Sequence, residues 1–143
     1  MLNDELSILI TDDDIWTTKV LNKTIKHLGF NKVTAVHSGY DAITFAIEEK
    51  PDIIFLDIIM SGIDGLQTLK MLKKIPATKD VKVIIVSGST DIQHLGSAMK
   101  LGAADYISKP FSSKVIQQKI SNLYPTVFNN NVNAQATTIT ATI

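Results

Sequence analysis

Residues 51–57 read PDIIFLD, so that an apolar run ends on the carboxylate of Asp57, and a loop from Ile58 to Gly65 follows. A continuous apolar run of this kind is typical of a buried strand in a parallel sheet. Burying a carboxylate costs several kcal/mol unless the charge is paired or bound to a metal ion. Packing therefore does not explain Asp57, and its position predicts a chemical role.

Other apolar runs in the chain also end on polar side chains. They are residues 6–11 before Asp12, Asp13 and Asp14, residues 81–86 before Ser87, and residues 103–108 before Lys109. Segments with apolar residues at helical spacing, such as Leu66, Leu69 and Leu72, accompany the strands. The chain thus alternates strand and helix five times, which predicts an α/β fold with helices on both faces of a parallel sheet.

This fold brings three carboxylates together. In a sheet of strand order 2-1-3-4-5, ligands bind between the carboxyl ends of strands one and three, where the strand order reverses. Asp12 and Asp13 end strand one, and Asp57 ends strand three. Their repulsion, about 4 kcal/mol per close pair at an effective dielectric of about 20, is relieved by a cation or by protonation. An all-oxygen site suits a hard divalent ion, and Mg2+ is the first candidate.

Size and composition fit one folded domain. The chain has 143 residues, of which 45% are hydrophobic and 20% charged. Lysine plus arginine balance aspartate plus glutamate at 14 each, so no net basic charge attracts nucleic acid, which is not expected as a direct partner. The absence of cysteine fits a cytoplasmic protein, and no apolar run has the length of a membrane span or a signal sequence. We therefore expect a cytoplasmic protein without membrane contact.

The composition changes after Pro125. Residues 126–143 carry no charge and have no periodic helical face. We therefore expect a folded domain over residues 1–124 and a disordered tail or linker over residues 125–143. The alternative is an added strand at a sheet edge, which the β-branched alternation of residues 138–143 favours.

Four motifs stand in order at four predicted strand ends. They are the Asp12-Asp13 pair, Asp57 with residues 58–65, Ser87-Gly88, and residues 102–111 with the sequence GAADYISKPF. Together they resemble the receiver domain of two-component response regulators over about residues 5–124. Their spacing is most similar to the stand-alone chemotaxis-type regulator, which has no output domain. The resemblance implies a flavodoxin-like, doubly wound sheet with five helices.

The resemblance also implies a reaction and a metal site. Asp57 would take a phosphoryl group from the phosphohistidine of a sensor histidine kinase or phosphotransfer protein. Mg2+ would be held by Asp13, Asp57 and the backbone carbonyl of Ile59, with Asp12 acting mainly through metal-bound water. The domain would be a phosphorylation-dependent switch that catalyses its own phosphorylation and dephosphorylation, and not a classical enzyme.

Two further groups would contact the phosphoryl oxygens. Lys109 would pair with one oxygen as a point charge, and Ser87 would donate its hydroxyl to another. The resemblance also implies a cis Lys109-Pro110 peptide bond, which would turn the lysine toward Asp57. Only X-Pro bonds adopt this geometry at low cost.

The expected output is a contact between the monomeric domain and a partner protein. When Ser87 turns toward the phosphoryl group, the vacated space is expected to admit Tyr106, the proposed switch. A static, half-buried tyrosine is the alternative. The partner surface would be the face made by the fourth helix (91–101), the fifth strand and the fifth helix (112–123). Its exposed lysines, Lys100, Lys114 and Lys119, would suit an acidic or amphipathic segment.

Two other functions remain as alternatives. One is a phosphohydrolase of the haloacid dehalogenase type that uses Asp12 as nucleophile, although Trp16 does not fit that motif and no second acidic pair follows late in the chain. The other is an inactive receiver-like module that only binds partners. Modification of Asp57, of Asp12 or of neither by a small phosphodonor would separate the three.

Other polar residues are expected to have structural roles, or receive no role. Asp14 is expected in the first turn of the first helix, and Asp64 is expected to cap the helix that begins near Leu66. Ser61 stands where the family commonly has proline, which predicts a less rigid loop after Asp57. The three histidines share no ligand spacing and receive no role.

Overall fold

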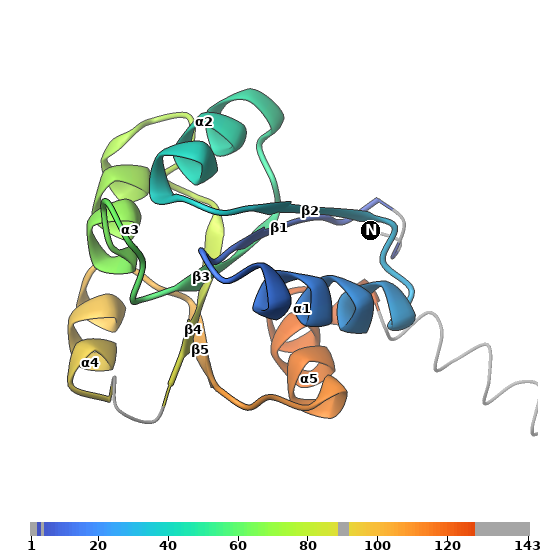
Figure 1. The fold of residues 1–143 in the computed structure, drawn as a ribbon. Helices are drawn as coiled ribbons and strands as arrows, with labels where there is room; N and C mark the ends of the chain where they lie inside the picture. The colour runs from blue at the N-terminus through green and yellow to red at the C-terminus, as the bar shows by residue number, and fades with distance from the viewer. Residues whose placement is uncertain (1–2, 4, 89–91, 128–143) are drawn as a thin grey trace, which may run out of the picture.

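The computed structural model describes residues 3, 5–88 and 92–127, which form one parallel sheet covered by helices (Figure 1). The strands follow the order β2-β1-β3-β4-β5, and every neighbouring pair is parallel. Their bounds are β1 (Ser7–Thr11), β2 (Lys32–Val36), β3 (Ile53–Asp57), β4 (Lys82–Ser87) and β5 (Asp105–Ser108). The predicted α/β fold and its strand order are therefore confirmed.

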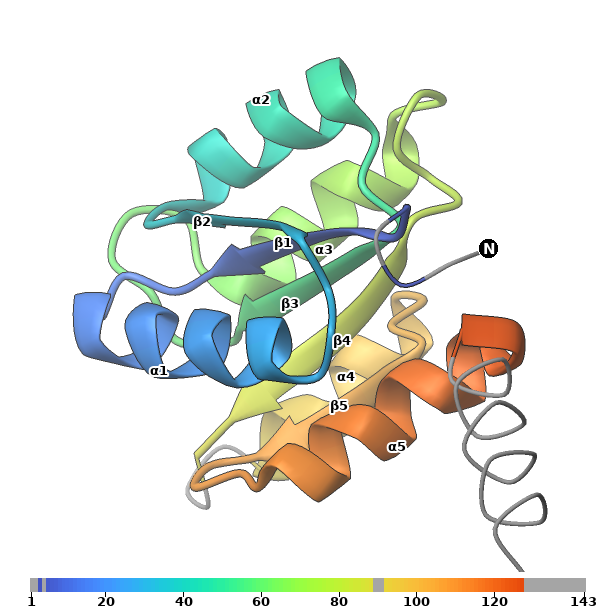
Figure 2. The same cartoon turned by 90° about the vertical axis from the view of Figure 1, so that its right-hand side faces the viewer.

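Helices cover both faces of the sheet, as Figures 1 and 2 show. One face carries α1 (Ile15–His27) and α5 (Ser113–Leu123), and the other carries α2 (Gly39–Glu49), α3 (Gly65–Lys74) and α4 (Ile92–Lys100). This arrangement follows from right-handed crossovers between parallel strands, because the order of the strands reverses at β1.

Side-chain oxygens satisfy free N–H groups at the starts of four helices. The N-cap residues of α1, α2, α3 and α5 are Asp14, Ser38, Asp64 and Ser112. Asp64 also forms a reciprocal capping box with Gln67, which confirms its predicted role. Asp14 caps α1 from the position just before the first turn, where its side chain accepts from the Trp16 N–H.

The sheet separates two apolar clusters. Ile8 and Ile10 pack on the face of α1 and α5, and Leu9 packs on the face of α2, α3 and α4. The central strand β3 is buried at every position, including Asp57 with only 6% of its surface exposed. The strand thus has the burial on both faces that its continuous apolar sequence predicts.

The fold continues past the predicted boundary at residue 124. Residues 125–127 are helical, and Val127 is buried in the cluster under α1 and α5. The rest of the predicted tail, residues 128–143, lies outside the described residues, as does the alternative strand at 138–143. No helix within the described residues has the length and apolar character needed to cross a membrane.

Candidate functional site

The three predicted acids meet at the carboxyl end of the sheet. Thr11 and Leu56 are partners in the β1–β3 register, so the residues that follow them, Asp12 and Asp57, end neighbouring strands side by side. One carboxylate oxygen from each of Asp12, Asp13 and Asp57 lies within 4.8 Å of the other two. Asp12 and Asp57 are buried, whereas Asp13 is exposed. The cluster predicted from the sequence is therefore present.

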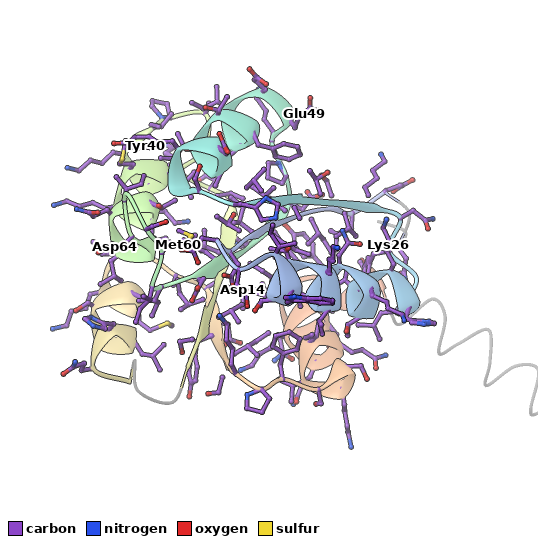
Figure 3. The ribbon with its side chains drawn as sticks, viewed as in Figure 1. Asp14, Lys26, Tyr40, Glu49, Met60 and Asp64 are labelled. Atoms are coloured by element: carbon purple, nitrogen blue, oxygen red, sulfur yellow. The ribbon has the colours of Figure 1, made fainter. Side chains whose placement is uncertain are left out.

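Two loops border this cluster. Figure 3 labels Asp14, which precedes α1, and Met60 and Asp64, which lie between β3 and α3. The α3 end of the second loop is held close to the sheet, because the Gly65 N–H donates to the Ile58 carbonyl at 2.7 Å. The site is thus formed where loops from two neighbouring strands turn into helices.

Lys109 reaches the cluster from the end of β5. Its Nζ lies 3.0 Å from Asp12 Oδ2 and 3.4 Å from Asp57 Oδ1. Its backbone N–H donates to the Ser87 carbonyl at 2.7 Å, which ties the end of β5 to the end of β4. The Lys109-Pro110 peptide bond is cis, as the resemblance predicted.

Ser87 is the last residue of β4, with 1% of its surface exposed. Val86 is the register partner of Asp57, so Ser87 lies one position farther toward the carboxyl edge. The structure therefore brings together the predicted residues Asp12, Asp13, Asp57, Ser87 and Lys109.

The charges in the site are strongly coupled. Burial, followed by the nearby Asp12 carboxylate, raises the pKa of Asp57 to about 7, although Lys109 acts in the opposite direction. Burial lowers the pKa of Lys109, but its hydrogen bond to Asp12 and the charge of Asp57 outweigh that effect and raise the pKa overall. Within the described residues, Lys109 pairs with two of the three acids, Asp12 and Asp57, so negative charge remains available to a cation.

The donor set fits a magnesium ion. Mg2+ binds oxygen ligands at about 2.1 Å, so two ligands of one ion lie no more than about 4 Å apart. The three carboxylate oxygens all lie within 4.8 Å of one another, close to this value. Ile59 lies two residues after Asp57, with 57% of its surface exposed, and a role for its carbonyl stays a prediction.

Ser61 has a contact that the sequence pattern does not predict. Both its backbone N–H, at 3.0 Å, and its hydroxyl, at 3.3 Å, donate to Asp13 Oδ2. Proline has neither donor. The loop that a proline would stiffen is therefore held in this chain by hydrogen bonds to one of the acids.

Gly65 is a second residue that the sequence analysis missed. A Cβ at this position would overlap the carbonyl oxygen of Asp57 and lie 2.6 Å from the Cα of Ile58. Because both neighbours are backbone atoms, only glycine lets α3 begin so close to the end of β3. The sequence indicates this role of Gly65 only by the presence of a glycine at the end of the loop.

An exposed apolar surface lies beside the site. Trp16 and Val20 of α1 are 74% and 53% exposed. Together with Lys109, Pro110 and Phe111 they line a cavity of about 280 Å³. This surface therefore adjoins Lys109, which pairs with Asp57.

Tyr106 and Lys119 contact each other on the predicted output face. Tyr106 is 42% exposed, and Lys119 Nζ lies 5.3 Å from the centre of its ring. Lys119 also pairs with Asp105 at 2.9 Å, so its charge is less available than the sequence suggests. Of the three lysines predicted for this face, Lys100 and Lys114 are exposed.

Comparisons with known proteins agree with this geometry. The family model described as response regulator receiver domain matches residues 8–121. "Probable transcriptional regulator ycf27" of Cyanophora paradoxa is 32% identical over 116 residues, which cover 81% of this chain and 47% of that protein. "Protein PilG" of Pseudomonas aeruginosa is 30% identical over 112 residues, which cover 78% of this chain and 82% of that protein.

A solved structure gives the same result. The signal receiver domain of a DNA binding response regulator protein from Colwellia psychrerythraea matches with a TM-score of 0.76 and 28% identity, over 84% of this chain and 98% of that chain. The chain spans about half the length of the ycf27 relatives that it matches. From the family model and these similarities, the chain belongs to the receiver domains of two-component response regulators.

Proposed function

We propose that Asp57 accepts a phosphoryl group from the phosphohistidine of a sensor histidine kinase or a phosphotransfer protein. The observation that carries this proposal is the meeting of Asp57 with Asp12, Asp13 and Lys109 at the carboxyl edge of the sheet. A carboxylate oxygen of Asp57 attacks phosphorus, the P–N bond breaks, and its electron pair returns to the histidine nitrogen. The product is an acyl phosphate on Asp57.

The other residues of the site balance charge during transfer. Asp12, Asp13, Asp57 and the backbone carbonyl of Ile59 would hold Mg2+, which supplies positive charge between two anionic reactants. Lys109 lies 3.4 Å from Asp57 Oδ1 and pairs with a phosphoryl oxygen once the carboxylate is phosphorylated.

Ser87 and the exposed surface beside Lys109 complete the proposal. The Ser87 hydroxyl donates to a second phosphoryl oxygen. The donor protein contacts the apolar surface of Trp16 and Val20, because this surface adjoins the lysine that faces Asp57. The domain acts as a monomer in the cytoplasm and signals by protein contact, without binding nucleic acid or membrane. Since the chain belongs to the receiver family, the phosphohydrolase alternative is not proposed.

A small phosphodonor tests the proposal directly. After incubation with acetyl phosphate and Mg2+, we expect one added phosphoryl group, which borohydride reduction and peptide mass spectrometry locate at Asp57. Modification of Asp12 would instead support the phosphohydrolase alternative. A protein that binds Mg2+ but takes up no phosphoryl group would be an inactive receiver-like module.

Mg2+ binding is expected to weaken about tenfold between pH 8 and pH 6, because protons compete for Asp57, whose pKa is raised to about 7. Asp57 is largely ionised above that pKa, so affinity rises with pH through 7 and then levels off. Calorimetry gives the affinity, and the fluorescence of Trp16, which lines a cavity with Lys109, gives an independent reading. The Asp57→Asn variant should lose most of this pH dependence. A change in Mg2+ affinity centred near pH 4 would contradict the raised pKa of Asp57.

Phosphorylation is expected to change the face made by α4, β5 and α5. As Ser87 turns toward the phosphoryl group, the end of β4 moves, and Tyr106 leaves the contact with Lys119 for the space that opens. Amide shifts with and without beryllofluoride measure this change. Shifts at Tyr106 and Lys119 that disappear in the Asp57→Asn variant would support the switch. Shifts confined to residues around Asp57 would leave Tyr106 as a static tyrosine.

A further inference from the structure

A groove runs between α1 and the edge strand β2, and Trp16 is not among the residues that line it. It has a volume of about 610 Å³, and its apolar lining includes Ile15 and Ala35. Figures 1 and 2 both place α1 alongside β2, and β2 is the outermost strand on this side of the sheet. The volume lies within the range of about 300–1,000 Å³ that is typical of ligand sites.

The groove is bordered by positive charge. Lys19, Lys23 and Lys26 of α1 line it, and all three are exposed. Spacings of four and three residues place them along one side of the helix. Figure 3 labels Lys26 near the end of α1. Among the described residues that line the groove, none is acidic.

This charge is local to one part of the sequence. Between Ile15 and Tyr40 the chain has four lysines, two histidines and no acid, although its net charge is zero. His27 and His37 also line the groove. A neutral protein thus carries a basic rim around an apolar groove, and electrostatic complementarity predicts a partner with the opposite charge.

We propose that the groove between α1 and β2 binds an acidic, extended segment of a partner protein. Apolar side chains of the segment enter beside Ile15 and Ala35, and its carboxylates pair with Lys19, Lys23 and Lys26. The N–H and C=O groups on the outer side of an edge strand can pair with an added strand. The geometry of β2 therefore favours a segment that lies along it.

A protein segment fits better than nucleic acid. The three lysines span about 10 Å of helix axis, which is a short row for a phosphate backbone. The chain contains no arginine, the side chain with the best geometry for paired phosphate contacts. The apolar lining at Ile15 and Ala35 makes more favourable contacts with aliphatic side chains than with a sugar-phosphate chain.

The proposal is independent of phosphoryl transfer. The groove lies on the β2 side of α1, whereas Trp16 and Val20 line the cavity that includes Lys109. Binding is therefore expected to persist in the Asp57→Asn variant. Loss of phosphoacceptance and loss of groove binding can be measured separately.

The test is an amide-shift titration of the protein with a synthetic peptide of about eight residues that alternates glutamate with leucine or valine. An extended peptide of this length spans α1 and β2. We expect shifts in α1 and β2, and none with a peptide in which lysine replaces glutamate. The Lys19→Glu/Lys23→Glu variant should bind about 20-fold more weakly, because two attractive contacts become repulsive.

A charge-matched control separates local from global electrostatics. The Lys70→Glu/Lys74→Glu variant changes the net charge by the same amount at exposed lysines of α3, and it should bind within about twofold of wild type. Equal weakening in both variants, or no shifts at millimolar peptide, would overturn the proposal. Shifts of α1 and β2 with a DNA oligonucleotide or with anionic vesicles, but not with the acidic peptide, would overturn it in favour of those partners.

Discussion

The Asp57→Asn variant is expected to take up no phosphoryl group from acetyl phosphate and Mg2+, while the Asp14→Asn variant keeps nearly full activity. Asparagine has the shape of aspartate but lacks the anionic oxygen that attacks phosphorus and the charge that holds a metal ion. The Asp14 carboxylate is exposed and accepts hydrogen bonds from the Trp16 N–H and the Thr17 hydroxyl. The hydroxyl contact is the largest cause of its lowered pKa. Asparagine at position 14 still caps the helix.

Intact-mass measurement over time gives the extent of phosphorylation for both variants. Thermal unfolding controls for misfolding. The folded protein holds a proton on Asp57 up to a pKa of about 7, against an ordinary pKa of 3.8 for an aspartate carboxyl, so ionisation of Asp57 lowers stability as the pH rises between these values. The Asp57→Asn variant should therefore be at least as stable as wild type at pH 8. Equal loss of phosphorylation in the two variants would mean that the acids are misassigned.

Gly65→Ala is expected to destabilise the fold by about 1–3 kcal/mol, the typical cost of overpacking. The added methyl group overlaps the Asp57 carbonyl and approaches the Ile58 Cα, and neither backbone atom can move without shifting the end of β3. Phosphorylation should fall in the same variant, since Asp57 belongs to the displaced segment.

Gly96→Ala is the matched control. Gly96 lies within α4, and a Cβ there meets no atom within 4 Å. Alanine in a helix interior is favoured over glycine by about 1 kcal/mol, so this variant should be neutral or more stable. Urea unfolding measures both variants. A Gly65→Ala protein as stable as wild type would show that α3 can move away from β3 at little cost.

The sequence predicts most of this site because the site is built from strand ends. An apolar run identifies a strand, the residue after it lies at the sheet edge, and the strand order decides which edges are neighbours. These steps place Asp12, Asp57 and Ser87 correctly. They need no knowledge of loop geometry.

The contacts that the sequence does not predict are set by loops and by helix rotation. Ser61 bonds to Asp13 only because the β3–α3 loop turns its N–H and hydroxyl toward the acid. Val20 and Leu21 are adjacent apolar residues in α1, yet one is 53% and the other 2% exposed. Lys119 pairs with Asp105 and contacts Tyr106 because of how α5 packs on β5. The periodicity of apolar residues predicts which face of a helix is buried, but not where the buried face ends.

The hydrogen bond between the Lys109 N–H and the Ser87 carbonyl has a consequence for protein engineering. Because main-chain atoms make it, exchanging either side chain leaves the bond in place, and the β1–β3 register likewise fixes positions 12 and 57 through the main chain. The backbone therefore holds these positions in place whichever side chains they carry. Histidine or cysteine at positions 12, 13 and 57 would present zinc ligands in place of a magnesium site.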